Sequence, residues 1–253
     1  MGFVDDSDVA ALRDGRLSML RISGVRPDSL SDSYLLSKLV AAEDYAASRM
    51  RVFFAPTQVL PENVTQQEID ALDAAVPPVP WVIDPGYPVD PEAWHGERWG
   101  IIKTRHRPLI SVASITFVYP QPMTTVFVVP SEWIRLDRKY GQISLLPGPT
   151  SLQVPLWALG IMGSGRVVPH VIQIRYVAGL ENIRTKHPAV VNLVYRLAVL
   201  GILKDQFLPQ SGSISADGLS ESASFDLDKF QEAIDKELDA LRDAILGLRF
   251  TVL

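Results

Sequence analysis

The sequence predicts an α+β protein, in which a helical body (one N-terminal helix plus two C-terminal helices) carries an inserted small antiparallel β module. Residues 188–208 and 226–246 place apolar side chains at helical spacing. Between the helical regions, residues 110–177 hold short runs rich in Val, Ile, Thr and aromatic residues, which favour strands. A proline-rich stretch precedes these runs and marks a boundary.

Residues 1–75 are expected to supply an extended arm and the N-terminal helices of the helical body. Ser31 is one of several N-cap residues that precede a periodic stretch ending near Phe53. Thr65 and Glu68 have the spacing of a capping box, which predicts a second, short helix.

Residues 76–98 are predicted to be a stiff linker, because they contain six prolines. The tryptophans in and near it either anchor a partner or hold the linker against its own domain, and the second interpretation is favoured. Its carboxylates are interpreted as solvated charges rather than a catalytic cluster; they are Asp84, Asp90, Glu92 and Glu97.

Residues 99–178 are predicted to form the inserted β module, as a small antiparallel sheet or a barrel. Gly141 is expected at the left-handed position of a hairpin turn. The expected strands cover residues 110–119, 125–128, 132–137, 142–146 and 171–177. Between the last two lies a long loop, 147–169, which either folds back over its own sheet or is covered by a partner. Its apolar cluster includes Leu156, Trp157, Ile161 and Met162.

Residues 179–253 are predicted to complete the helical body. A buried helix is followed by a Ser/Gly-rich loop, 209–224, and an amphipathic helix. The apolar stripe of that helix comprises Leu227, Phe230, Ile234, Leu238, Leu241 and Ile245. The tail after it alternates like a strand, and such a segment adds either to its own sheet or to a neighbouring subunit.

Composition and motif spacing indicate no catalytic chemistry. The chain has no cysteine, which excludes disulfides and thiolate chemistry, and its four histidines lack metal-ligand spacing. We expect no cofactor, no metal, no enzyme activity, no leader and no membrane span. The net charge of −5 does not suit a protein whose main role is to bind the phosphate backbone of a nucleic acid.

One basic run, Lys103–Arg107, is the candidate nucleic-acid patch. Alternation would place Lys103, Arg105 and Arg107 on one face of a strand. Those cations could bind phosphates or a partner's carboxylates. Alternatively, they protect a solvent-facing strand edge against aggregation, which is the commoner role of such charges.

The C-terminal pattern resembles the end of the head–tail connector (adaptor) proteins of tailed bacteriophages. The resemblance covers Tyr176–Leu253, with the loop Ser213-Ile-Ser-Ala-Asp-Gly-Leu-Ser-Glu-Ser222, and extends more weakly to Ser31–Phe54. It implies a virion neck protein, assembled in the host cytoplasm, whose copies form a dodecameric ring under the portal protein. It also implies contact with the next neck or tail ring, and a lumen through which DNA passes without specific binding.

On this interpretation, apolar loops and tails bury surface between subunits. The expected partner-binding residues are Leu248, Phe250, Val252, Leu253, Phe230, Leu241, Leu156, Trp157, Ile161 and Met162. The large β insertion departs from the simplest, nearly all-helical connectors and is compatible with another neck component. Two rival classes stay open: a hydrolase, and a free-standing binding module with an aromatic face built from Trp81, Trp94, Trp99 and Trp133.

Overall fold

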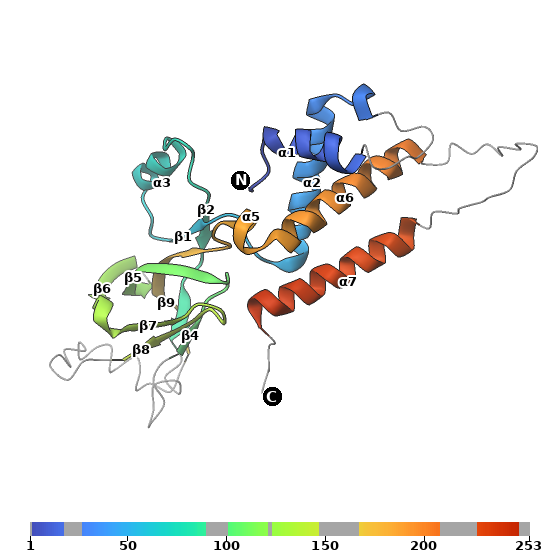
Figure 1. Cartoon of the computed structure of the whole chain (residues 1–253). Coiled ribbons are helices and arrows are strands. Elements are labelled where there is room, and N and C mark those ends of the chain that lie inside the picture. Colours follow the sequence, from blue (N-terminus) through green and yellow to red (C-terminus); the bar gives the residue numbers. More distant parts are fainter. Residues whose placement is uncertain are drawn as a thin grey trace, which may run out of the picture. The chain divides into compact units, whose positions relative to one another are not determined.

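The computed structural model describes residues 2–17, 27–89, 101–120, 123–146, 167–207 and 227–247 (Figure 1). The chain divides into two compact units. The β unit comprises Val52–Glu181 with Ile245–Leu253, and the helical unit comprises Gly2–Arg51 with Asn182–Ala244. The predicted α+β class is confirmed, and helices from both ends of the chain form the helical unit.

The helical unit is built on α2 (Asp32–Met50) and α6 (Pro188–Phe207), which pack against each other. Ser31 caps α2 as predicted, because its hydroxyl accepts a hydrogen bond from the Tyr34 N–H at 3.3 Å. The remaining elements of this unit are α1 (Asp6–Ala10), η1 (Ala11–Leu17), η2 (Pro27–Ser29), α5 (Ile183–Lys186) and α7 (Leu227–Leu246), whose last two residues count with the β unit.

The N-terminal arm is not extended, because residues 5–17 form a capped helix that continues into a π-helical turn. Arg184 of α5 holds this arm through Asp8, with nitrogen–oxygen distances of 2.7 and 2.8 Å. Glu43 of α2 is buried and accepts a hydrogen bond from the Phe3 N–H at 2.6 Å. Buried carboxylates on α1 and α2 therefore fix the start of the chain.

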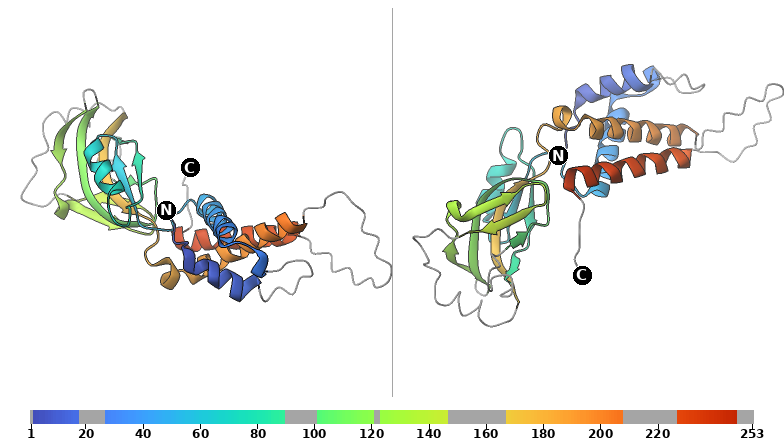
Figure 2. Two further views of the ribbon diagram at one scale, coloured as in Figure 1. Left: turned by 90° about the horizontal axis from the view of Figure 1, so that it is seen from above. Right: turned by 60° about the horizontal axis from the view of Figure 1, so that its bottom comes forward.

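The β unit contains two sheets that share one core (Figure 2). The larger has strand order β2-β1-β9-β5-β6, with β3 also paired to β9; β1 and β2 are parallel. The smaller has order β4-β8-β7 and is antiparallel. The strands of the larger sheet are β1 (Thr57–Pro61), β2 (Trp81–Asp84), β3 (Tyr87–Val89), β5 (Leu109–Pro120), β6 (Met123–Val128) and β9 (Val168–Ala178). Those of the smaller are β4 (Ile101–Lys103), β7 (Ile134–Asp137) and β8 (Gln142–Leu145), and a short η4 (Ser131–Trp133) precedes β7.

All five strands predicted from alternation are present, and Gly141 has the expected positive φ of 62°. The prediction of a linker over 76–98 does not hold for residues 81–89, which form β2 and β3. Helix α3 (Gln66–Asp73) has its predicted capping box, but it connects β1 to β2 within the β unit rather than joining the helical body. A parallel strand pair needs such a crossover.

No helix in the described parts of the chain is both long enough and apolar enough to span a lipid bilayer.

The buried Glu43 generates a pH-dependent prediction. Burial, with a smaller contribution from Asp8, raises the Glu43 pKa above its usual value of 4.5. The folded protein therefore binds this proton more tightly than the unfolded chain, so stability is lost as pH rises from 4.5 through the raised pKa. A glutamine, which stays neutral and still accepts the Phe3 N–H, should remove this loss.

We expect the free energy of unfolding of Glu43→Gln, relative to wild type, to increase between pH 4.5 and about pH 7 in urea titrations. Glu132→Gln, at an exposed position, is the control and should show no such trend. A Glu43→Gln advantage that stays constant or shrinks with rising pH would contradict this role of Glu43.

Candidate partner-binding surface of the helical unit

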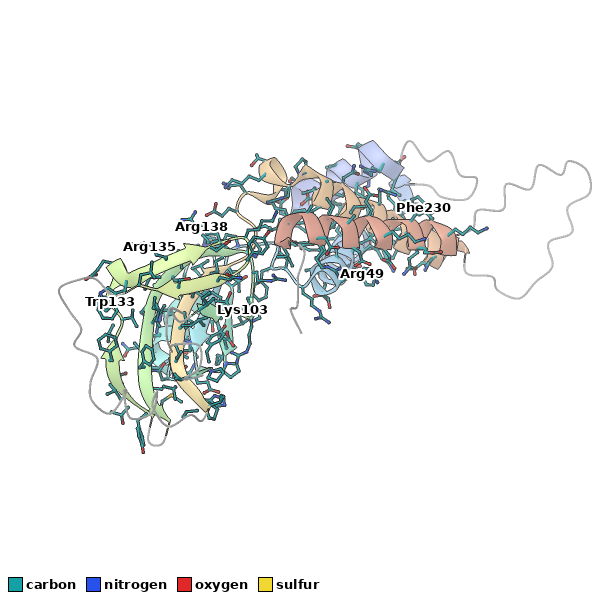
Figure 3. The ribbon with its side chains drawn as sticks, turned by 90° about the horizontal axis from the view of Figure 1, so that it is seen from below. Arg49, Lys103, Trp133, Arg135, Arg138 and Phe230 are labelled. Atoms are coloured by element: carbon teal, nitrogen blue, oxygen red, sulfur yellow. The ribbon has the colours of Figure 1, made fainter. Side chains whose placement is uncertain are left out.

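Helix α7 is attached to the helical unit by two buried apolar side chains and a rim of polar contacts. Ile234 and Leu238 are fully buried. Arg49 of α2 binds Asp239 at 2.9 Å and Asp235 at 3.6 Å (Figure 3). The hydrogen bond to Asp239 is the main cause that raises the Arg49 pKa above the usual value for arginine.

Polar contacts also tie α7 to α6 and to a second α2 side chain. Arg196 of α6 binds Glu237 at 2.5 Å, and the Tyr45 hydroxyl of α2 donates to Asp235 at 3.0 Å. Exposed ion pairs contribute about 0–1 kcal/mol each. Burying an aliphatic side chain contributes about 1.5–3 kcal/mol. The apolar pair therefore provides most of the attachment, and the ion pairs set the register of α7.

Two of the predicted partner-binding residues lie on described parts of α7. Phe230 is 37% exposed, and the Arg196 guanidinium lies over its ring, 5.4 Å from the centroid. Leu241 is half-buried. The other eight predicted residues lie outside the described residues; they are Leu156, Trp157, Ile161, Met162, Leu248, Phe250, Val252 and Leu253.

A groove of about 210 Å³ lies between α2, α6 and α7. Its floor is apolar and made largely of small residues, and its rim carries two lysines, one tyrosine and one glutamine. Lys38 on the rim is paired with Asp205 at 2.5 Å. The lining residues are Lys38, Ala41, Ala42, Tyr45, Leu197, Leu200, Gly201, Lys204 and Gln231. The groove could take one apolar side chain of a partner.

The prediction that Asp84 is a solvated charge is wrong. Asp84 is 2% exposed and accepts hydrogen bonds from the Tyr176 hydroxyl at 3.0 Å and from the Tyr87 hydroxyl. It also forms an ion pair with Arg105, whose guanidinium lies over the Tyr87 ring at 4.4 Å. A buried carboxylate is stable only with such partners. Asp90, Glu92 and Glu97 lie outside the described residues.

The Asp84 cluster is a closed structural network rather than a reactive centre. The Tyr87 hydroxyl accepts the Arg105 N–H at 3.1 Å, and the two tyrosine hydroxyls lie 3.0 Å apart. Burial is the main cause that raises the pKa of both tyrosines far above the usual range. Both phenols therefore stay neutral, and each of them already has a hydrogen-bond partner.

The histidines occupy structural positions in the described part of the chain. His106 stacks on Phe53, with ring centroids 4.9 Å apart, and burial lowers its pKa. His170 lies 3.3 Å from a Glu62 carboxylate oxygen, and burial lowers the pKa of His187. Among the described residues, no group of three His, Asp or Glu side chains could hold a metal ion. His95 is not among them.

The structure also changes the interpretation of the tryptophans and of the basic run. Trp133 is buried in the core of the β unit, and the Trp81 indole donates to Asp73 at 2.8 Å. Trp94 and Trp99 lie outside the described residues. Strand β4 ends at Lys103, so Lys103, Arg105 and Arg107 do not share one strand face as predicted.

Sequence reasoning missed the cations in and next to the β7–β8 turn. Arg135, Arg138 and Lys139 are exposed; Arg135 lies on the same small sheet as Lys103, and Arg138 and Lys139 lie in the turn itself. The signal was present, because a hairpin turn that reads Arg-Lys-Tyr-Gly is unusually basic for a chain of net charge −5.

No protein-family model matches the chain, and no curated protein matches it. Two solved structures are similar to it at low level. One is a chain in the neck of an empty gene transfer agent (GTA) particle computed with C6 symmetry, with 15% identity, a TM-score of 0.43, and coverage of 100% of this chain and 96% of that chain.

The other is a chain in the virion of a native GTA particle, with 15% identity and a TM-score of 0.43. The match covers 99% of this chain and 95% of that chain. Likeness at this level carries no conclusion about function.

The attachment of α7 generates a prediction with an internal control. We expect Leu238→Ala to lower the free energy of unfolding by about 2–5 kcal/mol, because it leaves a cavity under α7. Leu241→Ala, on the same helix but half-buried, should cost under about 1 kcal/mol. Urea unfolding followed by far-UV circular dichroism measures both, and equal losses would contradict the proposed attachment.

Proposed function

We propose that this protein is a structural component of a phage-type neck, an adaptor whose copies form a ring beneath the portal protein. The observation that carries the proposal is which segments of the chain form the helical unit. The stretches that resemble connector proteins, residues 31–54 and 176–253, contain α2, α6 and α7. These elements come from opposite ends of the chain and form most of one unit.

The helical unit has features that suit an adhesive role. Phe230 is exposed at the start of α7, and the groove beside α7 has an apolar floor. A partner side chain in that groove would be fixed by burial of apolar surface, and the polar rim would select its orientation. The tail after α7 would add further contact to a neighbouring ring.

Nothing in the described residues favours a rival function. The Asp84 cluster has its polar atoms already partnered, and Trp133 is buried rather than displayed on a binding face. In the proposed role the protein holds rings together and DNA passes through them, so its mechanism is burial of surface between subunits rather than chemistry on a substrate.

The proposal predicts a change of mass on contact with a portal. The 28.0 kDa chain is measured by light scattering, first alone and then mixed with a candidate portal protein. We expect monomers to assemble into a ring on the portal, and deletion of residues 247–253 or the change Phe230→Ala to weaken assembly at least tenfold.

Lys236→Ala, at an exposed position of the same helix, is the matched control and should assemble normally. A chain that stays monomeric in the presence of the portal would overturn the adaptor role. A Phe230→Ala variant that assembles as well as wild type would overturn the role of Phe230.

A further inference from the structure

The outward face of the small sheet in the β unit carries cations in a fixed register. Ile102, Ile143 and Leu136 pair across β4, β8 and β7 and belong to the core side. Side chains alternate along a strand, so the neighbouring rows face outward. One outward row is Ile101, Ser144 and Arg135, and the next is Lys103, Gln142 and Asp137.

The β7–β8 turn adds two more cations beside these rows. Arg138 and Lys139 are exposed (Figure 3 labels Arg138 beside Arg135). The turn is held to the segment after β4, because the Thr104 N–H donates to the Gly141 carbonyl and the Leu109 N–H donates to the Arg138 carbonyl, both at 2.8 Å. The cations are therefore carried on an ordered backbone.

Gly141 is required at this junction. Its φ is +62°, and a Cβ there would lie 2.7 Å from the Thr104 hydroxyl. Any other residue would push the turn away from Thr104. We call the outward face formed by Lys103, Arg135, Arg138 and Lys139 the basic face.

The cations of the basic face differ from other cations of the β unit. Arg105 and Arg175 are paired with Asp84 and Glu68. Within the described ranges, no ion pair is formed by any of the four cations of the basic face, although the Arg135 guanidinium donates to the backbone carbonyls of Glu132 and Ile134 at 2.8 and 3.2 Å. Asp137 is the one carboxylate in the two outward rows, and it accepts the Tyr140 N–H at 3.2 Å. The basic face therefore has an excess of positive charge in a chain of net charge −5.

Its chemistry suits a phosphate backbone better than a protein surface. Arg135 and Lys103 are separated by two strand spacings across the sheet and by two residues along the strands, which places their Cα atoms roughly 12 Å apart. That is about the width of the DNA major groove, so the two can reach phosphates on both of its sides. Gln142 and Ser144 between them are polar. Protein interfaces instead rely on buried apolar and aromatic anchors.

We infer that the basic face binds the phosphate backbone of double-stranded DNA without reading its sequence. The inference rests on the proposed function in one respect only, since a neck protein works close to packaged DNA. Four phosphate contacts would make the binding steeply salt-dependent, with a slope of log K against log[salt] of about −3.6.

The test uses the full chain and a labelled random-sequence duplex of about 30 base pairs, with fluorescence anisotropy measured between about 50 and 200 mM NaCl. We expect affinity to fall about a hundredfold over this range. Arg135→Gln/Arg138→Gln should weaken binding at the low-salt end at least tenfold and make the slope shallower by about 1.8.

The control is Lys229→Gln/Lys236→Gln, which removes the same charge from exposed positions of α7 and should leave affinity within about twofold. Equal losses in the two double variants would overturn the inference, because they would reflect net charge alone. Absence of duplex binding at the lowest salt would also overturn it. Binding of a glutamate-rich polypeptide, but not of duplex, would assign the basic face to an acidic protein partner and refute the DNA assignment.

The result is separable from the proposed function. The Arg135→Gln/Arg138→Gln variant should still assemble on the portal, because its substitutions alter none of the residues proposed to bind partners, Phe230 and the tail after α7 included. Loss of DNA binding with normal assembly supports both proposals, and DNA binding by a chain that never assembles would support the basic face alone.

Discussion

Strand β9 is the constraint on which the β unit depends. It pairs with β5 along most of its length, with β1 at its C-terminal end and with β3 near its N-terminal end. Its side chains Ile172, Ile174 and Tyr176 are almost fully buried. One strand from the last third of the chain thus organises segments that lie earlier in the sequence, from β5 back to β1. The strands that pair with β9, directly or through β1, also position α3 and the Asp84 network.

The two units use charge in different ways. In the helical unit, arginines such as Arg49, Arg184 and Arg196 are engaged with carboxylates that fix α7 and the N-terminal arm. In the β unit, Arg105 completes a buried network, whereas the four cations of the basic face point outward. The two proposals follow this division, because they assign attachment to proteins mainly to the helical unit and contact with a polyanion to the β unit.

Much of the fold could be predicted because local signals were strong. Alternation identified β5 to β9, and caps at Ser31 and Thr65 identified the starts of α2 and α3. Strands β1 to β3 could not be found in this way, since prolines surround them and their pairing with each other and with β9 decides their conformation. The same reason hid Asp84, whose partners Tyr87, Arg105 and Tyr176 meet only in the folded sheet. Of the predicted partner-binding residues, only Phe230 and Leu241 are among the described residues. The basic face could not be predicted from the sequence, because the pairing register of three strands decides which side chains share that face.

Residues 2–51 and 182–244, from two separate parts of the chain, fold as one unit, and most of the segment between them folds as another. Native-state hydrogen exchange in increasing denaturant tests this division most directly, because amides of one cooperative unit open together. We expect the slowest amides of α2 and α6 to share one opening free energy and one denaturant dependence, distinct from those of β5 and β9. Exchange in which α2 follows β1, its neighbour along the chain, while α6 opens separately would contradict it.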